Sequence, residues 1–234
     1  MQETVIPRPE PVTLAVQGSS ARFPVRRIYC VGRNYADHAR EMGATGRELP
    51  FFFGKPADAV LNVAEGTEGQ MPYPPQTHNL HHEVELVAAL GAGGHNLSPE
   101  QAARAVWGYA IGLDMTRRDL QAEAKKQGRP WETAKGFDHS APIGPVHPVA
   151  ATGDLTKGHI GLTINGEQRQ TGDLSDMIWS VPEAIAYLST LFELRAGDLI
   201  FTGTPAGVGA VVSGDQLEAQ IQGLGTLRVT IVQA

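Results

Sequence analysis

Short apolar runs recur along most of this chain, some alternating with polar residues and some uninterrupted, and Gly, Pro and Asn separate them. From Arg27 onward, eight runs have the length and the β-branched or aromatic content of β-strands. They are RIYCV, PFFF, EVELVAAL, GYAIGL, HIGLTING, DLIFTG, QLEAQI and TLRVTIV. The pair Asn165-Gly166 predicts a hairpin with a type I′ turn, because that turn needs positive φ at both central residues.

Fewer stretches have the end signals of helices. In three places a Ser or Thr is followed three residues later by Gln, Glu or Asp, a capping-box spacing that predicts helix starts at Ser98, Thr116 and Ser180. A fourth helix is predicted over residues 35–42, because Asn34 can serve as its N-cap. All four helices are short.

The arrangement of these elements indicates the fold class. Helices do not alternate regularly with strands, which disfavours a doubly wound nucleotide-binding sheet. We therefore predict an α+β fold dominated by β-structure. Residues 1–25 contain four prolines and one short alternating run, so we expect an N-terminal arm or edge hairpin there. Residues 26–234 are expected to form the main domain.

Composition and charge narrow the choice of partners. The 234 residues include 41% hydrophobic residues, enough for a sizeable core. The formal net charge is −6 and the longest basic run is the pair Lys125-Lys126, which argues against nucleic acid and anionic membranes. No window approaches the roughly 20 apolar residues of a membrane span, and no signal peptide is evident, so we expect a cytoplasmic protein with a small-molecule partner. The single cysteine, Cys30, excludes an intrachain disulfide and is expected to be a buried thiol.

Three acidic residues form the main candidate site. In HHEVEL, strand alternation places Glu83 and Glu85 on one face, opposite Val84 and Leu86. Two like charges side by side are unfavourable unless water or a cation neutralises them. Asp114 ends the strand GYAIGLD and adds a third hard oxygen ligand. With no cysteine involved, this set suits Mg²⁺ or Mn²⁺, although a solvated sheet face would produce the same local pattern.

Histidines near these acids offer a rival hypothesis. His78, His81 and His82 beside Glu83 would suit the two-histidine, one-carboxylate iron site of an oxygenase. Strand alternation argues against it, because His81 and His82 point to opposite faces and cannot easily bind one ion.

A possible general base lies on the predicted helix over residues 35–42. His38 and Glu41 are three positions apart on one helical face, so the carboxylate could orient the imidazole and raise its basicity. A solvated surface pair would look the same.

Taken together and in order, several motifs resemble the fumarylacetoacetate hydrolase family. They are GRNYADHAREMG, FFFGKPADAV, HHEVELVAALG, GLDMTRRDLQAEAKKQGRPWETAKGFDHSAPIGP, INGEQRQ and GDLIFTGTPAGVG. The resemblance covers the chain from about Arg27 to the C-terminus and is greatest to fumarylpyruvate hydrolases, then to acylpyruvases. It implies a mixed β-roll fold, a homodimer and a divalent cation, usually Mg²⁺.

Position by position, the resemblance implies three groups of site residues. The metal ligands are Glu83, Glu85 and Asp114. The water-activating pair is His38 and Glu41, and Lys135 stands beside the metal. The residues expected to line the substrate pocket are Lys55, Arg118, Gln121 and Thr204. By periodicity alone, Arg118 and Gln121 could also belong to a solvated helix face, and the loop around Thr204 could be an ordinary glycine-rich turn.

The implied reaction is metal-dependent hydrolysis of a carbon–carbon bond in a 2,4-dioxo acid. The favoured substrate is 3-fumarylpyruvate, an intermediate of gentisate degradation, and its products are fumarate and pyruvate. Alternatives that keep the same site are an acylpyruvase and an oxaloacetate decarboxylase or tautomerase. A non-catalytic module that binds 2-oxo acids is the alternative from a different functional class.

Overall fold

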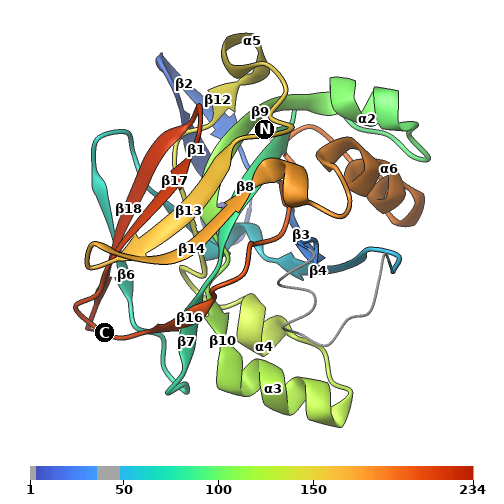
Figure 1. Ribbon diagram of the computed structural model, residues 1–234. Coiled ribbons are helices and arrows are strands. Elements are labelled where there is room, and N and C mark those ends of the chain that lie inside the picture. Colours follow the sequence, from blue (N-terminus) through green and yellow to red (C-terminus); the bar gives the residue numbers. More distant parts are fainter. Residues whose placement is uncertain (1–3, 36–47, 234) are drawn as a thin grey trace.

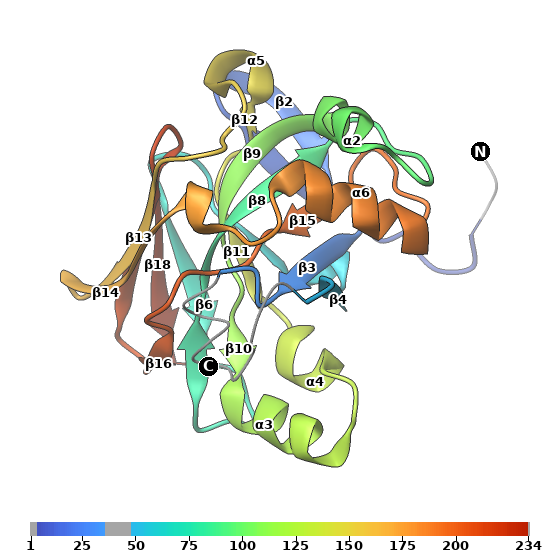
Figure 2. The same ribbon diagram turned by 45° about the vertical axis from the view of Figure 1, so that its right-hand side comes forward.

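The computed structural model describes residues 4–35 and 48–233, and every structural statement below refers to these residues. Strands make up the larger part of their regular secondary structure and form β-sheets that curl around one another, with short helices at the periphery (Figures 1 and 2). The predicted β-dominated α+β class is therefore confirmed. None of the described helices is long and apolar enough to cross a membrane.

The largest sheet has eight strands and runs through the centre of the molecule. Its order is β4 (Phe51–Lys55), β3 (Ile28–Gly32), β15 (Leu199–Phe201), β8 (Val84–Leu90), β9 (Val106–Leu113), β11 (Ala141–Ile143) and β5 (Val60–Asn62), with β12 (His147–Pro148) also beside β9. β3 pairs in parallel with β15, and β5 with β11, while the other neighbours are antiparallel.

A second sheet of five strands packs against the central one and lies on the left of Figure 1. Its order is β14 (Glu167–Asp173), β13 (His159–Ile164), β17 (Gln216–Ile221), β18 (Gly225–Val232) and β6 (Glu68–Pro72). Asn165 and Gly166 connect β13 to β14 with φ values of 52° and 81°. The predicted hairpin is therefore confirmed, with its left-handed turn residues in place.

Two smaller sheets complete the β-structure. β1 (Thr13–Val16) and β2 (Ser19–Pro24) form an antiparallel hairpin near the N-terminus. β10 (Thr116–Arg117), β7 (Leu80–His82) and β16 (Gly209–Val211) form a three-stranded sheet next to the candidate site.

The helices lie in two groups. α2 (Pro99–Ala105) and α6 (Val181–Leu191) pack side by side at the upper right of Figure 1, and α3 (Arg118–Gln127) packs with α4 (Glu132–Lys135) at its lower end. A single turn, α5 (Val149–Thr152), and two short 3₁₀ turns, η1 (Ala57–Ala59) and η2 (Leu174–Asp176), complete the described elements.

Apolar side chains form two cores on the two faces of the central sheet. The seven residues of β8 are all buried, and they divide strictly by alternation. Leu86 and Ala88 join the core shared with the five-stranded sheet, whereas Val87 and Ala89 join the core under the N-terminal hairpin. Glu85 belongs to this second set by alternation. The face that carries it is therefore not a solvated sheet face.

Two of the predicted helix starts are confirmed and one is wrong. Ser98 and Ser180 form capping boxes at the starts of α2 and α6. Thr116 does not cap a helix, because it is buried in β10 and its hydroxyl donates to the Asp114 carbonyl oxygen at 3.1 Å. α3 begins at Arg118, without a side-chain cap.

The predicted helix over residues 35–42 lies almost entirely outside the described residues. The Asn34 side chain donates to the carbonyl oxygens of Trp179 and Thr202, both at 2.8 Å, and accepts from the Trp179 N–H at 2.8 Å. Asn34 thus ties together two segments that are remote in the sequence.

Candidate active site

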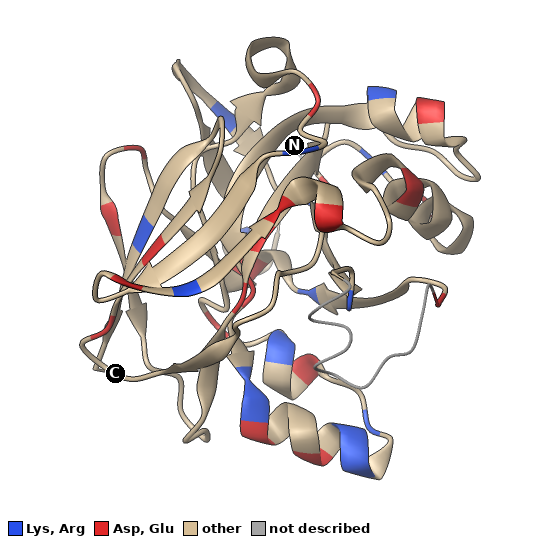
Figure 3. Cartoon of the chain, viewed as in Figure 1, with Lys and Arg blue, Asp and Glu red and all other residues tan. Residues whose placement is uncertain are grey.

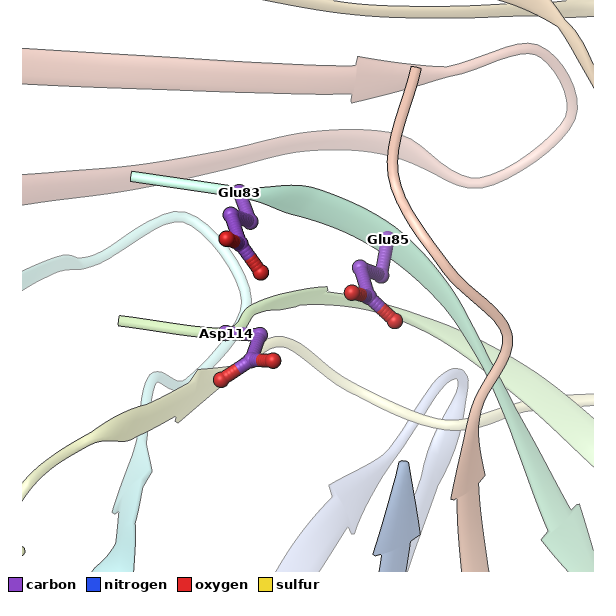
Figure 4. Close-up of side chains that lie close together, drawn as sticks. All are labelled: Glu83, Glu85 and Asp114. Carbon is purple, nitrogen blue, oxygen red and sulfur yellow. The ribbon is translucent and has the colours of Figure 1, made fainter. Parts of the chain in front are cut away.

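Three carboxylates converge where β8 begins and β9 ends. Glu83 directly precedes β8, Glu85 lies within it, and Asp114 follows β9. Val84 pairs with Leu113, and the Asp114 N–H donates to the Glu83 carbonyl oxygen at 2.9 Å, so the three side chains start from adjacent backbone positions. One oxygen of each lies within 4.8 Å of the others, and all three turn toward a common space (Figure 4).

Two buried lysines and the partly exposed Arg118 surround this acidic cluster. The Lys135 ammonium lies between two of the acids, donating to Glu83 Oε2 at 2.7 Å and to Asp114 Oδ2 at 2.6 Å. Arg118 Nη2 donates to Glu83 Oε1 at 2.5 Å, and Lys55 Nζ is 2.8 Å from Asp114 Oδ1. A buried charge without a partner costs several kcal/mol, so these contacts explain how the acids tolerate burial.

The pKa of Lys135 responds to its position in the cluster. Burial by itself lowers this pKa, but the Asp114 and Glu83 carboxylates more than offset burial and raise the pKa above its usual value. The side chain is therefore an ammonium at neutral pH. It can donate hydrogen bonds and stabilise negative charge, but it cannot accept a proton.

Two carboxylates, Asp114 and Glu85, show that the cluster also fits a divalent cation. Asp114 Oδ1 is buried and has no hydrogen-bond partner in the described chain, since Lys55 is within ion-pair distance but outside hydrogen-bond geometry. Glu85 Oε2 accepts a hydrogen bond from the Gly203 N–H at 2.7 Å. Burial, together with the negative charges of Asp114 and Glu83, raises the pKa of Glu85 well above its usual range. A bound cation would relieve that repulsion, and three hard carboxylates suit Mg²⁺ or Mn²⁺.

The loop after β15 holds Glu85 in place. The Thr202 N–H and hydroxyl both donate to the Leu86 carbonyl oxygen, at 3.1 and 2.8 Å, which fixes the loop against β8. Gly203 then presents its N–H to Glu85 with a φ of +100°, and a Cβ atom there would lie 2.7 Å from Asn34 Cβ. Close approach and backbone conformation both require glycine at this position.

A cleft opens beside the acids and contains most of the predicted pocket residues. Its described lining comprises Val31, Gly32, Arg33, Phe51, Phe53, Glu83, Glu85, Asp114, Arg118, Gln121, Trp131, Lys135 and Thr204. Arg118 and Gln121 project from the first turn of α3, along which basic and acidic positions follow one another (Figure 3), and Arg118 Nη1 donates to Gln121 Oε1 at 2.7 Å. The structure thus brings three of the four predicted pocket residues, Arg118, Gln121 and Thr204, to one cleft.

The remaining predicted residues are placed differently. Lys55 is not part of the described cleft lining, because its ammonium is buried behind Asp114 and donates to the carbonyl oxygens of Met115 and Lys135. It therefore supports the carboxylate from behind. His38 and Glu41 lie outside the described residues, so their role as a water-activating pair stays a prediction.

Six lining residues were not identified from the sequence: Val31, Gly32, Arg33, Phe51, Phe53 and Trp131. The three rings pack together, with Trp131 at 5.6 Å from each phenylalanine ring. The Arg33 guanidinium lies 5.7 Å from the centre of the Phe51 ring, and the Arg33 backbone adopts a left-handed φ of 57°. Alternation along PFFF would have placed Phe51 and Phe53 on one face of a strand, but nothing local indicated that this face borders the site.

The histidines do not form a metal site with the acids. His81 Nδ1 accepts from Arg118 Nε at 3.3 Å, and burial followed by the Arg118 charge lowers the pKa of His81 to about 4. His82 Nδ1 is instead 2.9 Å from Gln170 Oε1. In the described chain the only cluster with metal-ligand geometry contains Glu83, Glu85 and Asp114. The two-histidine iron site is therefore not supported.

Comparisons with known proteins show what the chain is similar to. The family model described as "Fumarylacetoacetate (FAA) hydrolase C-terminal" matches residues 27–232. Among sequence relatives, an oxaloacetate tautomerase of Escherichia coli is 42% identical over 208 residues, which cover 88% of this chain and 93% of the relative. The mitochondrial oxaloacetate tautomerase of Homo sapiens is 45% identical over 199 residues, covering 85% and 88% of the two chains.

The similar solved structures include proteins described as fumarylpyruvate hydrolases. A fumarylpyruvate hydrolase from Pseudomonas aeruginosa, in complex with Mn²⁺ and pyruvate, superposes with a TM-score of 0.97 at 55% identity and covers 99% of this chain and 100% of its own. A putative fumarylpyruvate hydrolase from Burkholderia cenocepacia gives a TM-score of 0.92 at 53% identity, with complete coverage of both chains.

Proposed function

This chain belongs to the fumarylacetoacetate hydrolase family, and from that premise we propose that it hydrolyses a carbon–carbon bond in a 2,4-dioxo acid, with 3-fumarylpyruvate as the favoured substrate. The observation that carries the proposal is the cluster of three buried carboxylates at the base of a cleft lined by Arg118, Gln121 and Thr204. The full-length similarity to a fumarylpyruvate hydrolase that binds Mn²⁺ and pyruvate supports it.

A divalent cation would be held by Glu83, Glu85 and Asp114. When bound, Mg²⁺ or Mn²⁺ supplies Lewis-acid stabilisation of negative charge that develops on the oxygens of the 2-oxo acid. Mn²⁺ is the ion in the related fumarylpyruvate hydrolase structure, and Mg²⁺ is our preferred ion from the sequence.

Charge accounting around the cluster supports a dianionic substrate. If all groups are ionised, the three carboxylates are balanced by Lys55, Lys135 and Arg118, so their formal charges cancel. A divalent cation would then give the site a formal charge of about +2. That charge would attract a dicarboxylate to a protein whose net charge is −6.

The cleft wall favours a flat, conjugated acyl group. Phe51, Phe53 and Trp131 provide an aromatic surface, and Arg33 lies beside it. Fumarylpyruvate has a planar unsaturated arm that ends in a carboxylate, which suits an aromatic wall with a nearby guanidinium. Oxaloacetate has no such arm, and the wall would be left without a partner.

The residues of the chain divide the remaining work. Arg118, Gln121 and Thr204 would bind substrate oxygens, while the Lys135 ammonium would stabilise the negative charge of the departing pyruvate enolate. His38, oriented by Glu41, is proposed to remove a proton from the attacking water. General-base help of this kind contributes on the order of 10²- to 10⁴-fold in rate.

The proposed reaction consumes one water molecule. Its oxygen bonds to the carbonyl carbon of the fumaryl group, and the bond from that carbon to the methylene carbon then breaks. The electron pair of this bond remains on the pyruvate enolate, which takes a proton to give pyruvate. The acyl half leaves as fumarate.

Oxaloacetate tautomerisation is a second candidate, because relatives that are 42% and 45% identical have that activity. Oxaloacetate is also a 2-oxo dicarboxylate with an enolisable carbon, so the same carboxylates and Lys135 could serve. It needs proton transfer but no attacking water.

One assay panel separates these candidates. Purified protein with Mg²⁺ or Mn²⁺ is given fumarylpyruvate, maleylpyruvate, acetylpyruvate and oxaloacetate, and the loss of each absorbance is followed. We expect the highest kcat/KM for fumarylpyruvate. A kcat/KM for oxaloacetate tautomerisation above the kcat/KM of every cleavage reaction would favour the second candidate. Turnover of none of the four compounds would overturn both candidates.

A further inference from the structure

Gln170 is a buried polar residue in a strand whose other residues are mostly exposed. It lies in β14, where its neighbours Gln168 and Arg169 face solvent while Gln170 itself is 0% exposed. It is the last residue of the motif INGEQRQ, and it belongs neither to the acidic cluster nor to the cleft lining.

The Gln170 amide joins the segment around Glu83 to the loop after β15. Its Oε1 accepts from the Val84 N–H at 3.0 Å and lies 2.9 Å from His82 Nδ1, so it contacts the residues on both sides of Glu83. Its Nε2 donates to Thr204 Oγ1 and to the Pro205 carbonyl oxygen, both at 2.8 Å. All four contacts are buried, and they use both hydrogens and both lone pairs of the amide.

The direction of each hydrogen bond in this network follows from two fixed groups. The Val84 N–H can only donate and the Pro205 carbonyl oxygen can only accept, which determines the orientation of the Gln170 amide. Since Oε1 also faces His82 Nδ1, that nitrogen must carry a hydrogen. His82 is then the Nδ1–H tautomer, and its Nε2 is a buried atom without a hydrogen-bond partner in the described chain.

The same reasoning fixes the polarity of the Thr204 hydroxyl. Thr204 Oγ1 accepts a hydrogen from Gln170, so its own hydrogen remains available for donation. Thr204 lines the cleft, next to the acidic cluster. The hydrogen bonds thus run in one direction, from the Val84 N–H through Gln170 to Thr204 and then to an acceptor in the cleft, and bonds in such a chain strengthen one another.

We propose that Gln170 is a positioning residue that keeps the Thr204 hydroxyl a hydrogen-bond donor toward a carboxylate or keto oxygen of the ligand. This inference rests on the proposed function in one respect: the ligand of the cleft is a 2-oxo acid. Gln170 does not touch that ligand. It acts through Thr204: its Nε2–H occupies a lone pair of the Thr204 hydroxyl oxygen, so the hydroxyl hydrogen stays directed into the cleft.

Gln170→Glu tests the proposal with an almost isosteric change. A carboxylate can still accept from Val84 and His82, but it cannot donate to Thr204 or to the Pro205 carbonyl oxygen. The Thr204 hydroxyl must then turn and donate to residue 170. The cleft then loses one donor. We expect the Kd of pyruvate, titrated calorimetrically into Mn²⁺-loaded protein, and the KM of the dioxo acid to rise about 10- to 100-fold, with a smaller change in kcat.

Double variants distinguish this role from general stabilisation. Thr204→Val removes the same donor, so Gln170→Glu combined with Thr204→Val should bind pyruvate about as weakly as either single variant. Gln216→Glu makes the same chemical change at an exposed position of β17 and should leave pyruvate binding unchanged. Fully additive losses in the double variant, or unchanged pyruvate binding in Gln170→Glu, would overturn the proposal.

A measurement on the wild-type protein does not depend on whether any variant folds. Long-range ¹H–¹⁵N spectra report which ring nitrogen of a neutral histidine carries hydrogen, and we expect Nδ1–H for His82. The Nε2–H tautomer would reverse the Gln170 amide and overturn the proposal. Wild-type protein that binds Mn²⁺ but no pyruvate would instead overturn the proposed function, and the His82 tautomer would still decide the direction of the network.

Discussion

Replacing Lys135 by Met removes the cation that lies between two carboxylates while keeping the length and much of the volume of the side chain. The Lys135 ammonium is buried and makes charge-assisted hydrogen bonds of 2.7 Å to Glu83 and 2.6 Å to Asp114. In the metal-free variant, both acids lose this partner and remain buried. The variant should therefore be less stable than wild type in the absence of divalent cations.

The size of the effect follows from the partners that remain. Removing one member of a buried ion pair costs about 3–5 kcal/mol. Glu83 keeps Arg118 at 2.5 Å and Asp114 keeps Lys55 at 2.8 Å, so we place the loss near the lower end, at about 3 kcal/mol. For a chain of this length, that corresponds to a fall in Tm of about 6–12 °C.

Thermal unfolding with EDTA and with excess Mn²⁺ tests this reasoning. A divalent cation can neutralise the same carboxylates, so Mn²⁺ should raise the Tm of Lys135→Met more than that of wild type and recover much of the loss. Lys126→Met, on the exposed surface of α3, is the matched control and should change Tm little in either condition. An equal deficit with and without Mn²⁺ would refute the argument, because it would assign the loss to packing rather than to charge.

Three further predictions concern a metal ligand, the proposed general base and the decrease of the unfolding free energy at acidic pH. Glu83→Ala should lose both Mn²⁺ binding and activity, and calorimetry that shows an unchanged Mn²⁺ titration would contradict the ligand assignment. His38→Ala should retain Mn²⁺ binding but lose fumarylpyruvate hydrolysis by at least about 10²-fold, so a fully active variant would remove His38 from the mechanism. Burial raises the pKa of Asp119, but hydrogen bonds from the Thr77 hydroxyl and the His78 N–H more than offset it, so the folded-state pKa lies below the usual value. The stabilisation from this carboxylate is present above the unfolded-state pKa and is lost as pH falls through the folded-state pKa. In Asp119→Asn, the unfolding free energy from urea denaturation should therefore fall less steeply as pH is lowered. Identical slopes of unfolding free energy against pH for both proteins would disprove this linkage.

Local patterns predicted most of the β-structure because they report what each strand buries. Alternation and turn chemistry identified strands such as β8 and the hairpin at Asn165 and Gly166, where the left-handed φ values need these residue types. The pattern at Thr116 failed, because its two polar side chains have distant or non-helical partners: Thr116 binds the Asp114 carbonyl oxygen, and Asp119 binds Thr77. Tertiary contacts overrode a local capping signal.

The candidate site was only partly predictable for the same reason. Spacing grouped Glu83 with Glu85, and strand ends suggested Asp114, but the position of Lys55 depends on sheet topology. Lys55 ends β4, at the edge of the central sheet, and its ammonium reaches Asp114 only after the sheet has assembled. Gln170 is similar, since nothing in INGEQRQ indicates which of its polar residues turns inward. The homodimer and the cytoplasmic location stay predictions.

The parallel pairing of β3 with β15 has a consequence for biosynthesis. Ile28 lies opposite Leu199, so the centre of the sheet cannot close until a ribosome has made nearly the whole chain. Such long-range pairing makes folding slow and leaves apolar strand edges open to aggregation in the meantime. A nascent chain that stops before Gly203 would lack the N–H that holds Glu85, and the three carboxylates would be exposed before the acidic cluster has formed. Expression yield should therefore depend on chaperones more than the modest size of the protein suggests.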